Sequence, residues 1–345
     1  MAALTIHVVL LWGIFGVSQA VGVIRGNKIN SMATGTRMSH YPLRALYQRT
    51  RTKAAVVTEW FNPAEKYELS EEIKRGEGPI ILYVPGVDGT GLTPFAQYAE
   101  ICSKYDLMCL SLNRSERCSF SDIQDMVKKK IAEYKSEGRE VWLIGESFGG
   151  IVSLSLGMGS SDERSTPDRI ITVNSASAFD RTFYGRISPG LITLPEPFFT
   201  MAVIPVGFLV LDQLMFQNIA QASLMAANGI FPDILKSPER QEFISKIAPD
   251  LIESMLLRSD DLRWRVANWV LPGCSEVNPR LSEVKVPVLA VAGTQDLLLP
   301  SKEEAMKFKE EIPSCEVILI EGAGHAGTLD QRTDLTSIIE SWVKQ

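Results

Sequence analysis

The sequence has little histidine, with only three among its 345 residues. His7 lies in an apolar N-terminal run, and His40 lies in the basic stretch that follows it. Only His325 falls within the region where we expect the folded body. A mechanism that needs an imidazole as general base must therefore use His325.

Cysteine is also scarce, and the number of cysteines is odd. No two have the C-x-x-C spacing of zinc or redox motifs, and a disulfide framework would be even in number and denser. We expect five reduced thiols with structural roles, and neither a metal site nor a cofactor. The five are Cys102, Cys109, Cys118, Cys274 and Cys315.

The chain lacks a surplus of positive charge, since its formal net charge is −6. A protein that binds the phosphate backbone of a nucleic acid needs a basic face, so we expect no nucleic-acid partner. The charged fraction of 22% and the hydrophobic fraction of 45% are enough for one large core and argue against general disorder.

The longest N-terminal apolar run, Ala2–Gly16, is too short for a comfortable membrane span of about 20 residues. Small residues follow it at Ser18 and Ala20, as a signal peptidase requires, so residues 1–20 are predicted to be a signal peptide. No Asp or Glu occurs from Val21 to Thr58, where Arg and Lys alternate with Ser and Thr.

This acid-free stretch predicts a transit-like segment at residues 21–54. A signal peptide followed by such a segment resembles the bipartite presequence of algae whose plastids have additional membranes. We therefore expect delivery to a plastid, with a secreted or membrane-associated protein as the alternative.

Residues 55–345 show apolar strands that alternate with helical patterns, which predicts an α/β protein with a mostly parallel sheet and helices on both faces. Strands are expected at Ala55–Phe61, Pro79–Pro85, Asp106–Leu112, Glu140–Gly145, Arg169–Asn174, Val286–Ala292 and Glu316–Ile320. Helices are expected at Pro94–Tyr105, after a cap at Ser119 up to Gly138, at Gly149–Gly157 and at Thr336–Val343.

The alternation stops between about residues 178 and 283, where helical spacing and prolines predict a helical cap insertion. Leu191–Phe216 is strongly apolar, and we expect Pro195, Pro197 and Pro205 to break any long helix there. The apolar residues could cover a bound acyl chain and contact a membrane surface, or they could form the core of the cap itself.

A G-x-S-x-G motif lies directly between a predicted strand and a predicted helix, at Gly145, Glu146, Ser147, Phe148 and Gly149. This is the setting of a nucleophile elbow, a tight turn that exposes the serine hydroxyl at the carboxyl edge of the sheet. The motif predicts an α/β-hydrolase fold with Ser147 as its nucleophile.

The partners that such a serine needs follow in the chain order of this fold, acid before histidine. Asp296 comes after the strand Val286–Ala292, and His325 comes after the strand Glu316–Ile320 in a glycine-rich loop. We predict that His325 is the general base and that Asp296 orients it.

An oxyanion hole needs two backbone N–H donors. We assign one to Phe148 and the other to Val87, in the loop Gly86–Gly91 after the strand Pro79–Pro85. The loop lacks the G-K-[ST] ending of a phosphate-binding loop, and we expect Asp88 to be a turn residue.

Four motifs together resemble the plant plastid esterase/lipase/thioesterase family, which includes the phytyl ester synthases. They are Pro85–Gly91 (P-G-V-D-G-T-G), Gly145–Gly150, Gly293–Pro300 and Gly322–His325. The resemblance covers Pro79 to the C-terminus. It implies an acyl lipid or acyl-CoA substrate and an alcohol acceptor such as phytol. Members of that family carry a second, acyltransferase-like domain, so the resemblance is to their hydrolase-like domain only.

We therefore predict a serine esterase, lipase or O-acyltransferase that acts on lipid-type esters or thioesters through an acyl-Ser147 intermediate. The alternatives are a thioesterase or lyase on the same scaffold, or a catalytically silent, ligand-binding protein. His325 and Asp330 also fit the H-x-x-x-x-D pattern of another acyltransferase class, but one such pair occurs easily by chance.

Overall fold

The structure is a computed structural model that describes residues 58–69, 78–112, 117–159, 163–209, 246–247, 250, 259–329 and 332–344. The predicted signal peptide at residues 1–20 and the transit-like segment at residues 21–54 lie outside the described residues.

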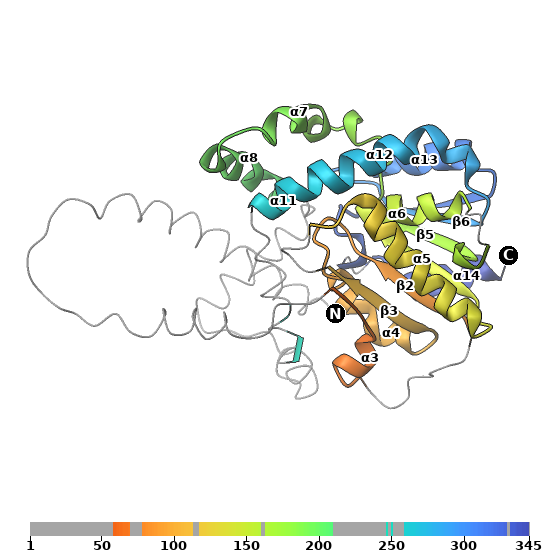
Figure 1. Ribbon diagram of the computed structural model, residues 1–345. Helices are drawn as coiled ribbons and strands as arrows, with labels where there is room; N and C mark the ends of the chain where they lie inside the picture. The colour runs from red at the N-terminus through yellow and green to blue at the C-terminus, as the bar shows by residue number, and fades with distance from the viewer. Residues whose placement is uncertain are drawn as a thin grey trace, which may run out of the picture.

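Seven strands form one sheet in the order β1-β3-β2-β4-β5-β6-β7 (Figure 1). Strands β2 to β7 are parallel, and β1 pairs antiparallel with β3 at one edge. The strands are β1 Glu59–Phe61, β2 Ile80–Val84, β3 Asp106–Ser111, β4 Val141–Glu146, β5 Arg169–Val173, β6 Val288–Gly293 and β7 Cys315–Ile320. The predicted mostly parallel sheet is confirmed.

Helices cover both faces of this sheet, which explains why its central strands are continuous apolar runs. Every residue of β2, β4 and β6 is buried. One core contains residues of α5 Phe120–Ser136, α6 Phe148–Gly157, α12 Leu271–Val277 and α13 Ser301–Glu311. The core on the opposite face contains residues of α3 Pro63–Lys66, α4 Tyr98–Cys102 and α14 Leu335–Val343.

The predicted helix cap at Ser119 is confirmed. Its hydroxyl accepts a hydrogen bond from the N–H of Asp122 at 3.2 Å, and the Asp122 carboxylate accepts one from the N–H of Ser119 at 2.6 Å. This reciprocal capping box satisfies two N–H groups that have no partner within the first turn of α5.

Some helical regions differ from the sequence prediction. The predicted helix Pro94–Tyr105 begins as a 3-10 turn, η1 Thr93–Gln97, before it continues as α4. Helix α13 was not predicted, because only Ala305 and Phe308 provide buried apolar side chains in an otherwise charged sequence. Such a narrow apolar stripe gives little periodic signal.

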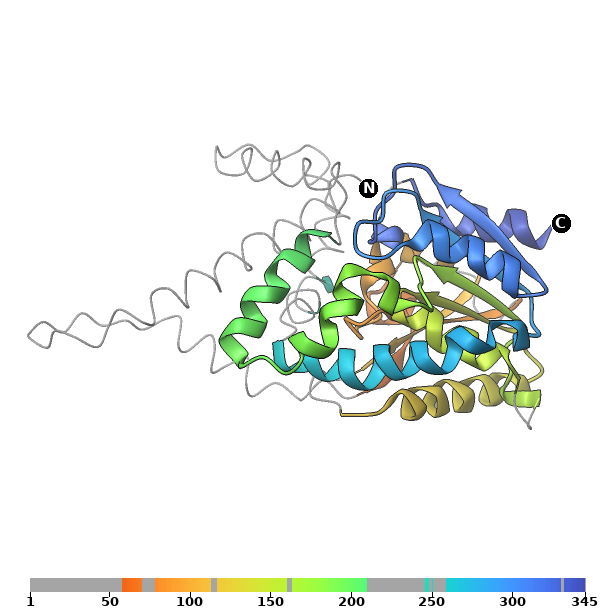
Figure 2. The same cartoon turned by 90° about the horizontal axis from the view of Figure 1, so that it is seen from above.

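The segment between β5 and β6, residues 178–283, contains helices joined by short turns and no strand among its described residues. We call it the β5–β6 segment. Besides α12, it contains η3 Phe179–Arg181, α7 Phe183–Leu191, α8 Glu196–Leu209, α11 Ser259–Arg265, a π-helical turn Val266–Val270 and the 3-10 helix η6 Asn278–Glu283. Helices α7 and α8 lie beyond one end of the sheet, and α11 continues into α12 as one long helical run (Figures 1 and 2).

The prediction that Pro205 breaks the helix is wrong, because α8 continues past this residue to Leu209. A proline inside a helix costs about 3 kcal/mol, a cost that packing of the neighbouring turns can outweigh. Pro197 is the second residue of α8, a position where the lost N–H would have no partner in any case. Among the described helices, none has the length and apolar character that a bilayer crossing requires.

The order of the strands creates a switch point between β2 and β4. Strand β3 lies on one side of β2, and β4 lies on the other, so the chain reverses its winding direction there. In open parallel sheets, ligands bind outside the carboxyl ends of the strands at such a point. The loop after β2 and the turn after β4 therefore meet where a site is expected.

Candidate active site

Ser147 lies between β4 and α6 with φ 52° and ψ −116°, a left-handed backbone conformation that costs a residue other than glycine about 1–3 kcal/mol. Its N–H donates to the carbonyl of Val173 at 2.8 Å, which anchors the turn to β5. A side chain at Gly149 would collide with the carbonyl of Val84, and one at Gly145 would collide with the backbone of Gly149. The two glycines of the motif are thus required by close backbone approach.

The structure brings together the three residues that the sequence predicts as a triad. Nε2 of His325 is 3.1 Å from Oγ of Ser147, and Nδ1 of His325 is 2.7 Å from Oδ2 of Asp296. These residues follow three different strands, β4, β6 and β7. The arrangement is a continuous hydrogen-bonded chain from a hydroxyl through an imidazole to a carboxylate.

The side chain of Asp296 is buried, and both of its carboxylate oxygens accept hydrogen bonds. Oδ1 accepts from the N–H groups of Leu298 at 2.9 Å and Leu299 at 3.0 Å, and Oδ2 accepts from the hydroxyl of Ser301 at 2.5 Å. Burial opposes ionisation, but His325 and these donors outweigh it and hold the pKa of Asp296 below its ordinary value. The carboxylate therefore stays ionised beside the imidazole.

His325 is 7% exposed. Burial favours the neutral imidazole, but the charge and the hydrogen bond of Asp296 outweigh burial and raise the pKa of His325 above its ordinary value. The site therefore stabilises the protonated imidazole that forms when histidine takes a proton from a hydroxyl.

Phe148 and the loop that contains Val87 both adjoin Ser147. Phe148 is the first residue of α6, where a backbone N–H has no partner within the helix. The loop that contains Val87 approaches from β2, and a Cβ atom built on Gly86 would lie 3.5 Å from Cβ of Ser147. The carboxylate of Asp88 accepts from the N–H of Thr90 at 3.0 Å, which confirms the prediction of a turn residue.

Asn174 supports the site and was not predicted. It directly follows β5, is buried, and has φ 47°. Its side-chain Nδ2 donates to the carbonyls of Gly324 and His325, both at 2.9 Å, and its Oδ1 accepts from the N–H of Gly293 at 2.7 Å. The Asn174 side chain thus joins β6 to residues 321–326, the loop after β7 that contains His325 and is called the histidine loop below. The only signal in the sequence is a polar residue at the carboxyl end of an apolar strand.

Glu146 is a second unpredicted support, although it lies within the G-x-S-x-G motif. Its buried carboxylate accepts from the hydroxyls of Tyr83 at 2.5 Å and Thr328 at 2.7 Å, and from the N–H of Thr328 at 3.3 Å. Burial raises the pKa of Glu146, although these hydrogen bonds oppose the rise. The contacts tie the elbow to the loop that follows His325.

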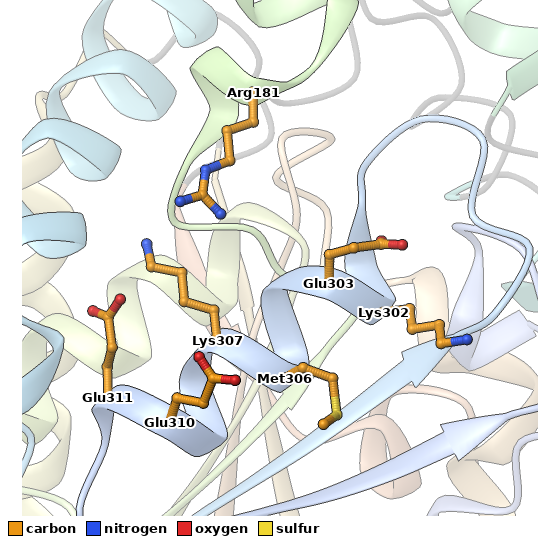
Figure 3. Close-up of a pocket in the computed structure, with 7 residues that line it drawn as sticks. All are labelled: Arg181, Lys302, Glu303, Met306, Lys307, Glu310 and Glu311. Carbon is orange, nitrogen blue, oxygen red and sulfur yellow. The ribbon is translucent and has the colours of Figure 1, made fainter.

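A separate hollow of about 400 Å³ lies on the outer side of α13 (Figure 3). Arg181 comes from η3, and the other lining residues come from α13. None of the three triad residues lines it, and its basic and acidic side chains are mixed. The lining residues are Arg181, Lys302, Glu303, Met306, Lys307, Glu310 and Glu311. Within the described residues, no cluster of His, Cys, Asp and Glu could hold a metal ion.

Residues 114–332 match the family model described as serine aminopeptidase, S33. The chain belongs to this α/β-hydrolase family. The match covers Ser147, Asp296 and His325, and it identifies the chain as a hydrolase-type enzyme by family. The α/β-hydrolase superfamily that the sequence motifs predict is thereby confirmed.

Two curated proteins of Arabidopsis thaliana are similar over 81% of the chain. Phytyl ester synthase 1, chloroplastic, is 25% identical over 284 residues, and phytyl ester synthase 2, chloroplastic, is 23% identical over 292 residues. The matched regions cover 38% and 39% of these relatives, so the chain spans about two fifths of their length.

Solved structures confirm the α/β-hydrolase fold. MenH from S. aureus aligns with a TM-score of 0.53 at 15% identity and covers 84% of this chain and 98% of its own. A putative lipase from Acinetobacter baumannii AYE aligns with a TM-score of 0.52 at 14% identity and covers 91% of this chain and 97% of its own. At such identities the likeness concerns the fold alone.

Proposed function

We propose that the chain is a serine acyl hydrolase or acyltransferase that acts on lipid-type esters or thioesters through an acyl-Ser147 intermediate. The observation that carries the proposal is the hydrogen-bonded chain from Ser147 through His325 to Asp296, with distances of 3.1 and 2.7 Å. Nucleophile, base and orienting acid lie within the reach that covalent acyl transfer needs.

In the proposed mechanism, Nε2 of His325 takes the proton of Ser147 as Oγ attacks the acyl carbonyl carbon. The carbonyl π electrons move onto oxygen, and the N–H groups of Phe148 and Val87 stabilise the resulting oxyanion. When the tetrahedral intermediate collapses, the leaving group takes the proton from His325. Water or an alcohol, activated by the same imidazole, then releases the acyl group and regenerates Ser147.

Two observations favour a lipid-type acyl group. The first is the similarity to two phytyl ester synthases. The second is the apolar surface of α7 and α8, where Phe183, Phe198 and Met201 are 69%, 62% and 69% exposed. We propose that the β5–β6 segment acts as a cap whose apolar residues receive the acyl chain and contact a membrane surface peripherally. Burial of each CH₂ group contributes about 0.8 kcal/mol.

The Arabidopsis relatives are chloroplastic proteins, which supports a plastid location for this chain. The acid-free basic stretch at residues 21–54 agrees with that proposal. The presequence itself can be tested by fusing residues 1–57 to a fluorescent protein. Import into plastids would support the proposal, and secretion would contradict it.

The proposal is tested by treating the full chain with a fluorophosphonate probe. Ser147 should displace fluoride from phosphorus and become covalently labelled, whereas a folded S147A variant should not. Absence of labelling on well-folded wild-type protein would exclude the enzyme function.

Product analysis then separates hydrolysis from transfer. Wild type and S147A are supplied with long-chain acyl-CoA or galactolipid, with and without phytol. Phytyl ester that depends on Ser147 indicates a transferase, whereas free fatty acid alone indicates a hydrolase. Product that forms equally with S147A would contradict the acyl-serine mechanism.

A further inference from the structure

Arg265, the last residue of α11, is fully buried against the loop that contains Val87. Its Nη1 donates to the carbonyl of Val87 at 2.9 Å and to the carbonyl of Asp88 at 2.5 Å. Gly89 lies so close that a Cβ atom built there would be 2.5 Å from the same nitrogen. A side chain of the β5–β6 segment therefore holds the backbone of the proposed oxyanion loop.

The chemistry of this contact favours arginine. Burial lowers the pKa of Arg265 to about 10, and the nearby carboxylates of Asp88 and Asp261 oppose that decrease. The guanidinium therefore remains charged at neutral pH. A charged N–H donor makes a stronger hydrogen bond to a carbonyl than a neutral donor does.

Trp269, four residues further along the same helical run, contacts the other proposed oxyanion donor. Its ring stacks on the ring of Phe148 with centroids 5.6 Å apart and an interplanar angle of 17°. Its indole N–H donates to the carbonyl of Cys118 at 2.7 Å, which fixes the ring. The guanidinium of Arg265 lies 4.5 Å above the centroid of the Trp269 ring, so the two side chains form one stack.

The backbone between them is a π-helical turn, Val266–Val270. Such turns are rare and occur frequently at functional sites. The turn sets the spacing of two side chains that reach two separate strand-end loops, one after β2 and one after β4.

We propose that Arg265 and Trp269 are positioning residues that set the two halves of the oxyanion hole from the β5–β6 segment. The proposal rests on the acyl-transfer function proposed above. Through this stack, a displacement of α11 would change the position of Val87 relative to Phe148. The rate of acylation is thereby coupled to the placement of the helical segment that covers the sheet.

The test compares R265M with the conservative variant R265K and with R263M as the matched control. Arg263 lies on the same helix, but its guanidinium contacts the ring of Phe199 and the carboxylate of Glu196 instead of the loop. Each full-length protein is assayed with a short-chain p-nitrophenyl ester and a fluorophosphonate probe. Thermal unfolding of each variant sets a working temperature at which all are folded.

We expect R265M to lower kcat and the labelling rate of Ser147 roughly 100-fold with KM changed less than threefold, because loss of one oxyanion donor costs about 10²–10³ in kcat. The kcat of R265K should be about tenfold higher than that of R265M, because lysine keeps a charged donor. The kcat of R263M should stay within twofold of wild type. W269L should also lower kcat, and W269F, which keeps a stacked ring, should restore most of it.

Hydrogen exchange of the peptide that covers residues 80–92 gives a readout independent of catalysis. Its amides should exchange faster in R265M than in wild type and R263M. If wild-type Ser147 does not label, the proposed function fails, and the exchange result still decides whether Arg265 holds the loop. Labelling of folded R265M at the wild-type rate, or unchanged exchange of this peptide, would overturn the positioning role.

Discussion

The carboxyl edge of the sheet and the helices α7 and α8 are held by different kinds of contacts. At the edge, buried polar side chains connect loops that are distant in sequence. Asn174 joins β6 to the histidine loop across 119 to 151 residues, and Glu146 joins the elbow to Thr328 across 182 residues. Buried hydrogen bonds of this kind are costly to leave unmade, so they specify one geometry.

In α7 and α8, several of the side-chain hydrogen bonds are local. Thr182 caps α7 by accepting from the N–H of Gly185 at 2.7 Å, and the hydroxyl of Ser188 donates to the carbonyl of Gly185 at 2.9 Å. Large apolar side chains of both helices face outward, with Phe183 and Met201 each 69% exposed. Because these side chains are exposed and the hydrogen bonds are local, substitutions on this surface should leave the structure of the sheet unchanged.

This contrast suggests that the sheet edge sets the catalytic rate and that α7 and α8 set the preference for acyl chain length. Substitutions at the edge of the sheet should change the rate for every acyl chain length. Substitutions in α7 and α8 should change the preference between short and long acyl chains and leave the chemical step intact.

The largest effect is expected for D296N, which should lower kcat/KM about 10³–10⁴-fold for butyrate and palmitate esters alike. Because Asp296 raises the pKa of His325, the acid limb of the wild-type profile should lie above the titration of an ordinary histidine. Catalysis needs the neutral imidazole of His325. Activity is therefore full at pH values above the pKa of His325 and is lost as the pH falls through that pKa. D296N should move the limb to lower pH.

The measurement is kcat/KM against pH for both esters, with S301A as the control. S301A removes one donor to Asp296 and keeps the carboxylate, so its loss should be far smaller. An acid limb at the same pH in D296N and wild type would contradict the assigned partnership.

The next effect is expected for N174D, which keeps the shape of the side chain and removes its donor. The new carboxylate would face the carbonyls of Gly324 and His325, which lose their partner. We expect the free energy of unfolding to fall by at least about 1–3 kcal/mol and kcat to fall roughly 10–100-fold. Urea unfolding and short-ester kinetics measure both.

N174G serves as the matched comparison. It relieves the positive φ of this position but also loses all three hydrogen bonds. If N174G is as active as wild type, the amide does not position His325.

A smaller effect is expected for E146Q. Burial raises the folded-state pKa of Glu146 above 4.5, so its protonated form is favoured by folding. The stability that this group contributes is therefore greatest below its unfolded pKa and declines as the pH rises through the folded pKa. The stability of E146Q relative to wild type should increase with pH over this window and then level off.

Urea unfolding at several pH values measures this difference, and kcat should fall only a few fold. Y83F, which removes one donor to the carboxylate, should raise the pKa of Glu146 further and extend the window upward. A stability difference that is independent of pH would show that Glu146 does not titrate in this range.

The sequence predicts the central strands well because parallel strands covered on both faces are continuous apolar runs. Thus β2, β4 and β5 were predicted to within one residue at each end. Helix α13 has too narrow a buried stripe to be predicted, and α8 continues past Pro205, where the sequence predicts a break. Helix propensity is a local property of the sequence, whereas tertiary packing decides whether helices such as α8 and α13 form.

The proximity of Ser147, Asp296 and His325 could be predicted because each follows a strand, and parallel strands bring their carboxyl ends to one edge. The roles of Asn174, Glu146 and Arg265 could not. Each is an ordinary polar residue whose hydrogen-bond partners are backbone groups or side chains far away in sequence. Only the register of the sheet and the path of the β5–β6 segment determine which loops these side chains reach.

The smallest effect, and the sharpest test of the contrast, is expected for F198S and M201S in α8. Both residues are largely exposed, so the variants should fold with unchanged stability. If these side chains bury part of an acyl chain, each loss should cost about 1 kcal/mol, which is roughly a fivefold rise in KM for a palmitate ester. The kinetics of a butyrate ester should not change.

Leu319 supplies the control, because it is also exposed, at 37%, but lies on the edge strand β7. L319S makes the same apolar-to-polar change outside α7 and α8 and should leave both esters unaffected. Equal losses for butyrate and palmitate in F198S would mean that α8 supports the catalytic edge, and the division between the two regions would fail. A rise in KM confined to palmitate would place the selection of acyl chains on α8 while the triad sets the rate.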